Sequence, residues 1–164
     1  MRLLILATLF AAPLAAQQQP VRIGVYDTRA IAVAYAHSSY NQEPLKAKMK
    51  EFEAAKAAGD TARVKELDHW GQTQQRKLHF QGFSRVPVAD LLVHVKDRLP
   101  EAAARANVQA IAADCDYLAP GVETIDLTDE LVRLYNPSPR VLSIVKDMKG
   151  KAPLPIEEVD KLKP

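Results

Sequence analysis

Cysteine is nearly absent from this chain, which has one, at position 115, among 164 residues. A disulfide within the chain is therefore excluded, and so are the paired-cysteine motifs of redox, haem and zinc proteins. We expect Cys115 to be a small buried side chain at the end of a strand. An intermolecular disulfide or a reactive thiol is the alternative, although no histidine or basic residue neighbours it in the sequence.

Glycine is also scarce, with six residues, and none belongs to a phosphate-cradling loop or to the G-x-S-x-G turn of a serine nucleophile. His69 and His79, with Asp68, are zinc-ligand types, but we interpret them as exposed residues of a polar helix. The acidic residues that follow position 113 lack the ligand spacing of an EF-hand, and capping and turn roles explain them better. The sequence therefore predicts no enzyme, no metal site and no cofactor.

Long apolar runs are confined to the N-terminus. Residues 1–16 have one arginine at position 2, an apolar stretch and a final Ala15-Ala16, a pattern that predicts a secretory signal peptide cleaved near Ala16. The stretch is shorter than the roughly 20 residues of a membrane-spanning helix. We expect residues 17–20 to form a linker, and the mature protein to be periplasmic or secreted, without a membrane span.

Basic residues do not dominate the composition. The net charge is +2 for the whole sequence and about +1 once the predicted signal is removed. A dense basic patch would be the mark of a nucleic-acid partner, so nucleic acid is not an expected partner.

Two short segments have the pattern of strands. In residues 21–27, Val21, Ile23 and Val25 alternate with Arg22 and Gly24, which is typical of a half-buried strand. Asp27 or Thr28 is suited to cap the helix that follows. Residues 108–115 contain a continuous small apolar run, which predicts a second strand buried on both faces. A polar turn follows, with an N-cap at Asp126 or Thr128 and then a helix.

The segment between these strands predicts a helical hairpin at about 42–99. In its first arm Leu45, Met49 and Phe52 follow i, i+4, i+7 spacing on a charged helix, with Pro44 in the first turn. Gly59 and Asp60 have the pattern of a helix end followed by a new N-cap. The second arm has a similarly narrow seam through Val64, Leu67, Trp70, and Leu78 to Phe80. Such seams are typical of coiled coils.

Gly71, Gly82 and Pro87 interrupt the second arm and predict that it is short, kinked or folded against the body. Past position 136, a helix begins near Ser138-Pro139 and ends at Gly150. Residues 151–164 are rich in proline and charge and are expected to form a flexible tail. We therefore expect one domain at 21–150, with the hairpin inserted between strands 21–27 and 108–115.

The expected fold is α+β and helix-rich, with a small β-sheet body and a projecting antiparallel, coiled-coil-like hairpin. With the signal peptide, the strand IGVYD at 23–27, the hairpin sequence LKAKMKEFEAAKAAGDTARVKEL and the later AIAADCDYLAPGVETIDLTDEL, the chain resembles the Skp (OmpH-like) family of periplasmic chaperones. Tyr117 and Asp126-Leu127-Thr128 match the tyrosine and the Asp-Ile-Thr motif of that family. The resemblance covers about 21–136.

The resemblance implies a homotrimer whose hairpins surround a cavity for unfolded outer-membrane or envelope proteins, with no chemistry involved. The candidate contact residues for clients or a partner are Met49, Phe52, Trp70 and Phe80. For the aromatic ones we favour packing of the two arms against each other, and contact with clients is the sharper hypothesis. A different hypothesis is an envelope interaction or structural protein whose hairpin docks one specific partner. An enzyme or small-ligand binder ranks third.

Overall fold

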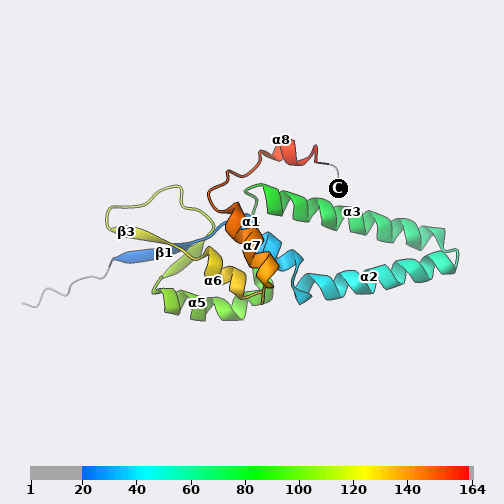
Figure 1. Ribbon diagram of the computed structural model, residues 1–164, viewed down its shortest axis with the longest axis horizontal. Helices are drawn as coiled ribbons and strands as arrows, with labels where there is room; N and C mark the ends of the chain where they lie inside the picture. Colours follow the sequence, from blue (N-terminus) through cyan, green and yellow to red (C-terminus); the bar gives the residue numbers. More distant parts are fainter. Residues whose placement is uncertain (1–19, 163–164) are drawn as a thin grey trace, which may run out of the picture.

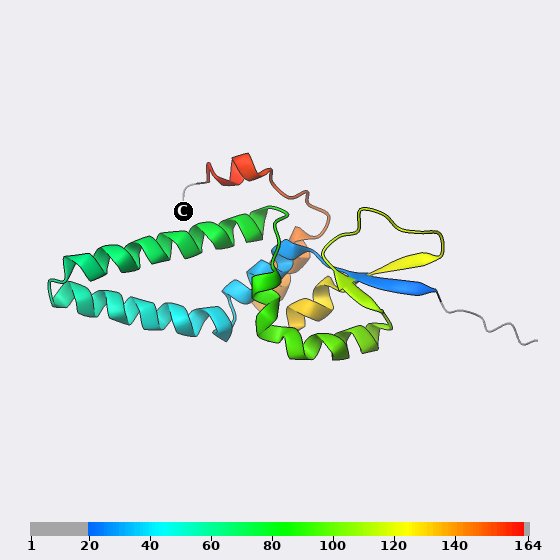
Figure 2. The same cartoon turned by 180° about the vertical axis from the view of Figure 1, so that it is seen from behind.

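The computed structural model describes residues 20–162 and shows a helix-rich, elongated protein with a small parallel sheet (Figure 1). The sheet and most of the helices form a body at one end, and two long helices project from it (Figures 1 and 2). The predicted signal peptide, residues 1–16, lies outside the described residues.

The sheet has three parallel strands in the order β2-β1-β3. Strand β1 (Val21–Val25) lies in the middle, between β2 (Ala110–Ala112) and β3 (Val122–Asp126). Ile23 is in register with Ala110 on one side and Thr124 on the other. The hairpin and four other helical segments all lie in the connection between β1 and β2, as a parallel pair requires a long crossover.

Three expectations about the sheet and its connections are corrected. Strand β2 is not buried on both faces, because Ala110 is exposed and the other two residues are half-buried at a sheet edge. Cys115 lies in the loop beyond β2 and is only partly buried. Strand β3 was expected to be a turn, because its polar residues mask the period-two pattern of a strand.

Helix α1 (Thr28–Ala36) forms the centre of the body. The carboxylate of Asp27 accepts a hydrogen bond from the Arg29 backbone N–H at 2.9 Å, which confirms the predicted N-cap. Ala30, Ile31 and Ala34 are almost completely buried in the main core. Thus α1 is covered on several sides, in agreement with its nearly continuous apolar sequence.

The hairpin consists of α2 (Ser39–Ala57) and α3 (Thr61–Phe83). Its tip has the predicted chemistry: Gly59 has φ of +70°, and Asp60 accepts a hydrogen bond from the Arg63 N–H at 3.0 Å. Helix α2 begins earlier than expected, so Pro44 lies inside it rather than in the first turn. Helix α3 is not interrupted at its glycines and ends before Pro87.

The stretch after the hairpin belongs to the body. It contains α4 (Ala89–Leu92), the 3₁₀-helix η1 (Val93–Arg98) and α5 (Leu99–Ala106). With α6 (Thr128–Arg133), these elements and the residues that flank them supply most of the rest of the main core. Its most deeply buried members include Val88, Leu91, Val95, Ala102, Leu131 and Val132. The projecting hairpin thus ends at residue 83 rather than near 99.

The C-terminal segment follows α7 (Pro139–Met148) and ends in α8 (Ile156–Val159). It was expected to be loosely held, but both views place it alongside α3 (Figures 1 and 2). The Leu154 N–H donates to the Phe83 carbonyl at 2.8 Å, and Val159 is only 2% exposed. The segment therefore has defined contacts along the hairpin.

Candidate binding cleft of the helical hairpin

The two arms of the hairpin are in close contact near its tip and diverge toward the body (Figures 1 and 2). Ala55 of α2 and Leu67 of α3 are the buried apolar residues of the arms. Between the diverging parts lies a cleft of about 1130 Å³. Helix α1 forms its base, and the end of α7 with residues 151–154 adds a further wall.

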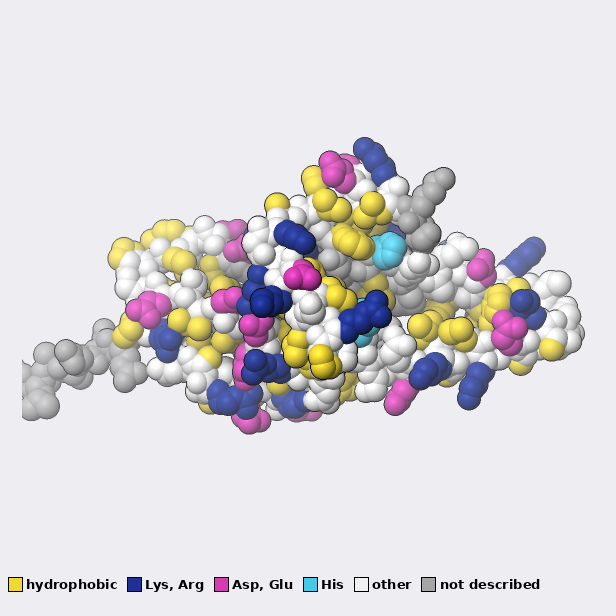
Figure 3. Space-filling model, in the orientation of Figure 1, with side chains coloured by type: hydrophobic (Ala, Val, Ile, Leu, Met, Phe, Trp, Pro, Cys, Tyr) yellow, Lys and Arg dark blue, Asp and Glu magenta, His cyan; other side chains and the backbone are white. Residues whose placement is uncertain are grey.

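The lining of the cleft is mainly apolar. Apolar side chains gather between the arms of the hairpin in the space-filling view (Figure 3). Those that line the cleft are Val33, Leu45, Met49, Phe52, Leu67, Trp70, Leu78, Phe83, Ile144, Met148 and Leu154. An apolar cavity of this size on a single chain is suited to side chains of another molecule.

Three of the four predicted contact residues line this cleft. Met49, Phe52 and Trp70 do so from both arms, and Met49 is 59% exposed. Phe80 does not, because its side chain lies in a separate groove between α3 and α8. The seam positions therefore pack the arms together near the tip and remain accessible nearer the body.

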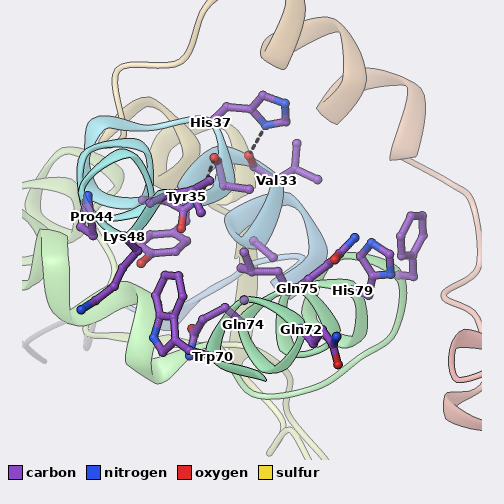
Figure 4. Close-up of a pocket in the computed structure, with 18 of the residues that line it drawn as sticks. Val33, Tyr35, His37, Pro44, Lys48, Trp70, Gln72, Gln74, Gln75 and His79 are labelled. Atoms are coloured by element: carbon purple, nitrogen blue, oxygen red, sulfur yellow. Dashed lines mark hydrogen bonds between the residues drawn. The ribbon is translucent and has the colours of Figure 1, made fainter. Parts of the chain in front are cut away.

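Polar groups are distributed around the apolar lining. Figure 4 shows His37 and Lys48 at different edges of the cleft, and Gln72, Gln74 and Gln75 on α3. The amides of the glutamines offer both donors and acceptors to a polypeptide backbone. The cleft thus combines apolar contact with hydrogen-bonding capacity that does not depend on a particular sequence.

An ion-pair network joins the two arms near the tip. The carboxylate of Glu51 on α2 lies 2.6 Å from the guanidinium of Arg63 on α3 and 3.1 Å from the ammonium of Lys48. Hydrogen bonds from Lys48 and Arg63 lower the pKa of Glu51 below its ordinary value. The residues are partly or fully exposed, so the network fixes geometry more than it adds stability.

Sequence reasoning missed the part of the cleft that the body provides. Val33 of α1, Ile144 and Met148 of α7, and Leu154 come from segments far apart in the chain. The apolar spacing of Ile144 and Met148 indicated an amphipathic helix, but nothing in the sequence places that helix beside the hairpin. Only the tertiary fold brings these side chains together.

His37, His79 and His94 each contact a different residue. Nδ1 of His37 lies 2.9 Å from the Val33 carbonyl oxygen, and the ring of His79 makes an edge contact with Phe83. The centre of the His94 ring lies 5.2 Å from the centre of the Tyr35 ring. Within residues 20–162 no group of three or more histidine, cysteine or acidic residues is placed to hold a metal ion.

The acidic residues near the sheet serve the backbone and neighbouring cations. Asp126 accepts from the Thr128 N–H at 2.8 Å, and Asp114 pairs with Arg85 at 2.5 Å. Asp126 thus has the capping contact expected of it, although Leu127 occupies the N-cap position of α6.

No family model, curated protein or solved structure matches this chain. In the part of the chain that the structure describes, no helix has the length and apolar character needed to cross a membrane.

Proposed function

We propose that this protein is an exported, non-enzymatic holdase that binds unfolded outer-membrane or envelope proteins in the cleft of its helical hairpin. The open apolar cleft between α2 and α3 carries the proposal. Apolar side chains that stay in contact with water generally mark interaction surfaces. Unfolded envelope proteins expose apolar segments that aggregate unless another surface covers them.

The composition of the cleft supports a broad range of clients. Met49 and Met148 contribute flexible thioether side chains, which adapt to differently shaped partners. Phe52 and Trp70 add large apolar area. Such a surface can bind many segments weakly, which is what retention of an unfolded chain requires.

The sheet supports the proposed homotrimer. Gly24 and its neighbours in register, Ile111 and Ile125, lie on the face toward the helical core. Side chains alternate along a strand, so Ile23 and Val25 lie on the opposite face. Parallel sheets are normally covered on both faces. In a homotrimer, the other two copies of the chain would cover the face that carries Ile23 and Val25.

Export is proposed from the pattern of residues 1–16. The oxidising periplasm is compatible with a chain that has one cysteine. Expression of the full sequence in a bacterium, followed by fractionation and mass analysis, tests this point. A mature protein beginning near Gln17 in the periplasm is expected, and an uncleaved cytoplasmic protein would contradict it.

The function is tested by dilution of a urea-unfolded outer-membrane β-barrel protein into buffer containing the mature chain. We expect light scattering from aggregates to be suppressed when the chain is equimolar or in modest excess. Unchanged aggregation at a tenfold excess would refute the holdase proposal. The mass of the mature protein by light scattering tests the homotrimer separately, and a monomer at micromolar concentration would refute it.

Docking of one specific envelope partner is the second candidate, because α1 and α7 give the cleft a defined base within a single chain. The two candidates differ in client range. A holdase suppresses aggregation of several unrelated unfolded proteins, whereas a docking protein binds one folded partner and leaves aggregation unchanged.

A further inference from the structure

A second groove lies between α3 and the C-terminal segment. It has a volume of about 360 Å³ and is lined by Gln72, Gln75, Arg76, His79 and Phe80 of α3 together with Val159, Asp160 and Leu162. Arg76 and Phe80 do not line the large cleft. The groove shares Gln72, Gln75 and His79 with the cleft. Arg76 and Phe80 lie on its other side, where α8 partly covers them.

The contacts of α8 define the kind of side chain that the groove accepts. Val159 is 2% exposed, and the next residue, Asp160, places its carboxylate 2.5 Å from the guanidinium of Arg76. That guanidinium in turn lies 5.6 Å from the centre of the Phe80 ring. The groove thus holds an apolar side chain and the carboxylate of the residue that follows it. Val159 lines the groove together with Phe80, and Asp160 pairs with Arg76.

Helix α8 leaves part of the groove empty. It is four residues long, and the apolar residues on either side of Val159 stay accessible, with Ile156 50% exposed and Leu162 41% exposed. A longer amphipathic helix has apolar residues three and four positions apart along one face. Such a helix would bury more apolar surface in the same groove than α8 does.

The attachment of α8 is weak compared with the attachment of Leu154, which lies just before it in the chain. Leu154 is fixed at the end of α3, where its N–H donates to the Phe83 carbonyl at 2.8 Å and its carbonyl accepts from the buried Ser84 hydroxyl at 2.8 Å. Beyond this point, α8 is held by Val159 and by an ion pair whose side chains are 68% and 54% exposed. Exposed ion pairs contribute little, so α8 can leave while Leu154 stays in place.

We propose that the groove formed by Arg76 and Phe80 is a docking site for short acidic amphipathic helices of partner proteins, and that α8 occupies it in competition with them. The acidic character follows from the occupant, in which Glu157, Glu158 and Asp160 surround Val159, and from the cation that receives Asp160. The proposal concerns a surface outside the cleft and does not depend on the holdase function.

The test uses a fluorescent peptide with the sequence of residues 153–164 and measures its anisotropy with the mature chain and with a variant that ends at Pro155. The shortened variant is expected to bind the peptide at least tenfold more tightly than the full chain. Val159→Asp in the full chain releases α8 without deletion and should produce the same gain. Arg76→Glu in the shortened variant should abolish binding, and a peptide carrying Asp160→Lys should restore it. Lys65→Glu, an equal charge change elsewhere on α3, should leave binding unchanged.

Equal binding by the full and shortened chains, or undiminished binding by the Arg76→Glu variant, would overturn the proposal. A smaller number of chains per assembly after removal of residues 156–164, measured by light scattering, would also overturn it. In that case the groove would hold the α8 of a second copy of the chain. Aggregation suppression by the shortened variant is measured in parallel, which separates a failure of this docking site from a failure of the cleft.

Discussion

Gly24 lies against Leu127 so closely that a β-carbon on Gly24 would come within 2.3 Å of the Leu127 Cδ1 atom. Leu127 cannot easily move away, because it is 3% exposed and its N–H donates to the Val25 carbonyl at 2.7 Å. The sheet and the start of α6 can therefore pack this closely only because Gly24 has no side chain.

Gly24→Ala is expected to lower the free energy of unfolding by about 1–3 kcal/mol, the usual cost of overpacking a core. The measurement is urea unfolding followed by circular dichroism. Gly71→Ala is the matched control, because nothing lies within 4 Å of a β-carbon there and the residue is inside a helix. It should raise stability by about 0.5–1 kcal/mol. A Gly24→Ala variant as stable as the parent would contradict the proposed fit.

Tyr135 connects the main core to the helical stretch after the hairpin. It is 2% exposed, and its hydroxyl donates to the Leu91 carbonyl at 2.9 Å. Tyr135→Phe removes this buried hydrogen bond, so we expect a loss of about 1–3 kcal/mol near neutral pH.

The same substitution should change the response to alkaline pH. Burial, with smaller effects of Tyr35 and Tyr40, raises the pKa of Tyr135 well above its ordinary value. The unfolded chain therefore loses this proton first, near pH 10. The contribution of Tyr135 is complete below about pH 10 and declines as the pH rises further. The stability gap between parent and variant should narrow above pH 10, and a constant gap would show that the hydroxyl titrates alike in both states.

Arg29 and Asp27 form an ion pair at the start of α1, with Nη2 and Oδ2 2.6 Å apart. Partial burial acts to raise the pKa of Asp27, but the hydrogen bonds and charge of Arg29 outweigh it, so that this pKa is lowered. The pair therefore stabilises the fold fully above the unfolded value of about 3.9, and this stabilisation is lost as the pH falls through the lower folded pKa.

Arg29→Met should cost about 3 kcal/mol at pH 7, because Arg29 is 8% exposed and also donates to the Lys151 carbonyl at 2.9 Å. Its stability should decline less steeply between pH 5 and pH 3 than that of the parent. Arg140→Met, at an exposed position of α7, should change neither the stability at pH 7 nor its decline between pH 5 and pH 3. An unchanged acid profile in the Arg29 variant would contradict the assignment.

Phe52→Ser and Trp70→Ser should together abolish aggregation suppression, because they remove one large aromatic side chain of the cleft from each arm of the hairpin. The solution mass should not change, since neither residue belongs to the sheet. Phe80→Ser is the comparison, and it should retain most of the activity because Phe80 lies outside the cleft. If suppression survives in the double variant, the cleft is not the site of client binding.

Local signals predicted the hairpin well. Gly59 and Asp60 were identified as the tip because a left-handed glycine and an N-capping aspartate have side-chain requirements that the sequence states directly. Strand β1 was likewise recognisable from the alternation of Val21, Ile23 and Val25. Tertiary contacts decided the rest: the third strand has polar residues at positions that a partner strand stabilises, and Gly71 is tolerated in a helix whose neighbours hold it.

The candidate site was predicted only in part. The seam spacing selected Met49 and Phe52 on one arm and Trp70 on the other, and all three line the cleft, but it could not separate them from Phe80. That separation depends on where α8 returns along the hairpin. A segment of prolines and charges carries no periodic signal for such a contact.

The cleft is open to solvent along the splayed arms, and this has a consequence for turnover. If the cleft binds clients as proposed, an occupant would enter and leave sideways between the arms. Its residence time is then set by how many apolar groups it still presents. A client that begins to fold withdraws those groups into its own core and so weakens its own attachment. Folding of the client would thus be the release signal.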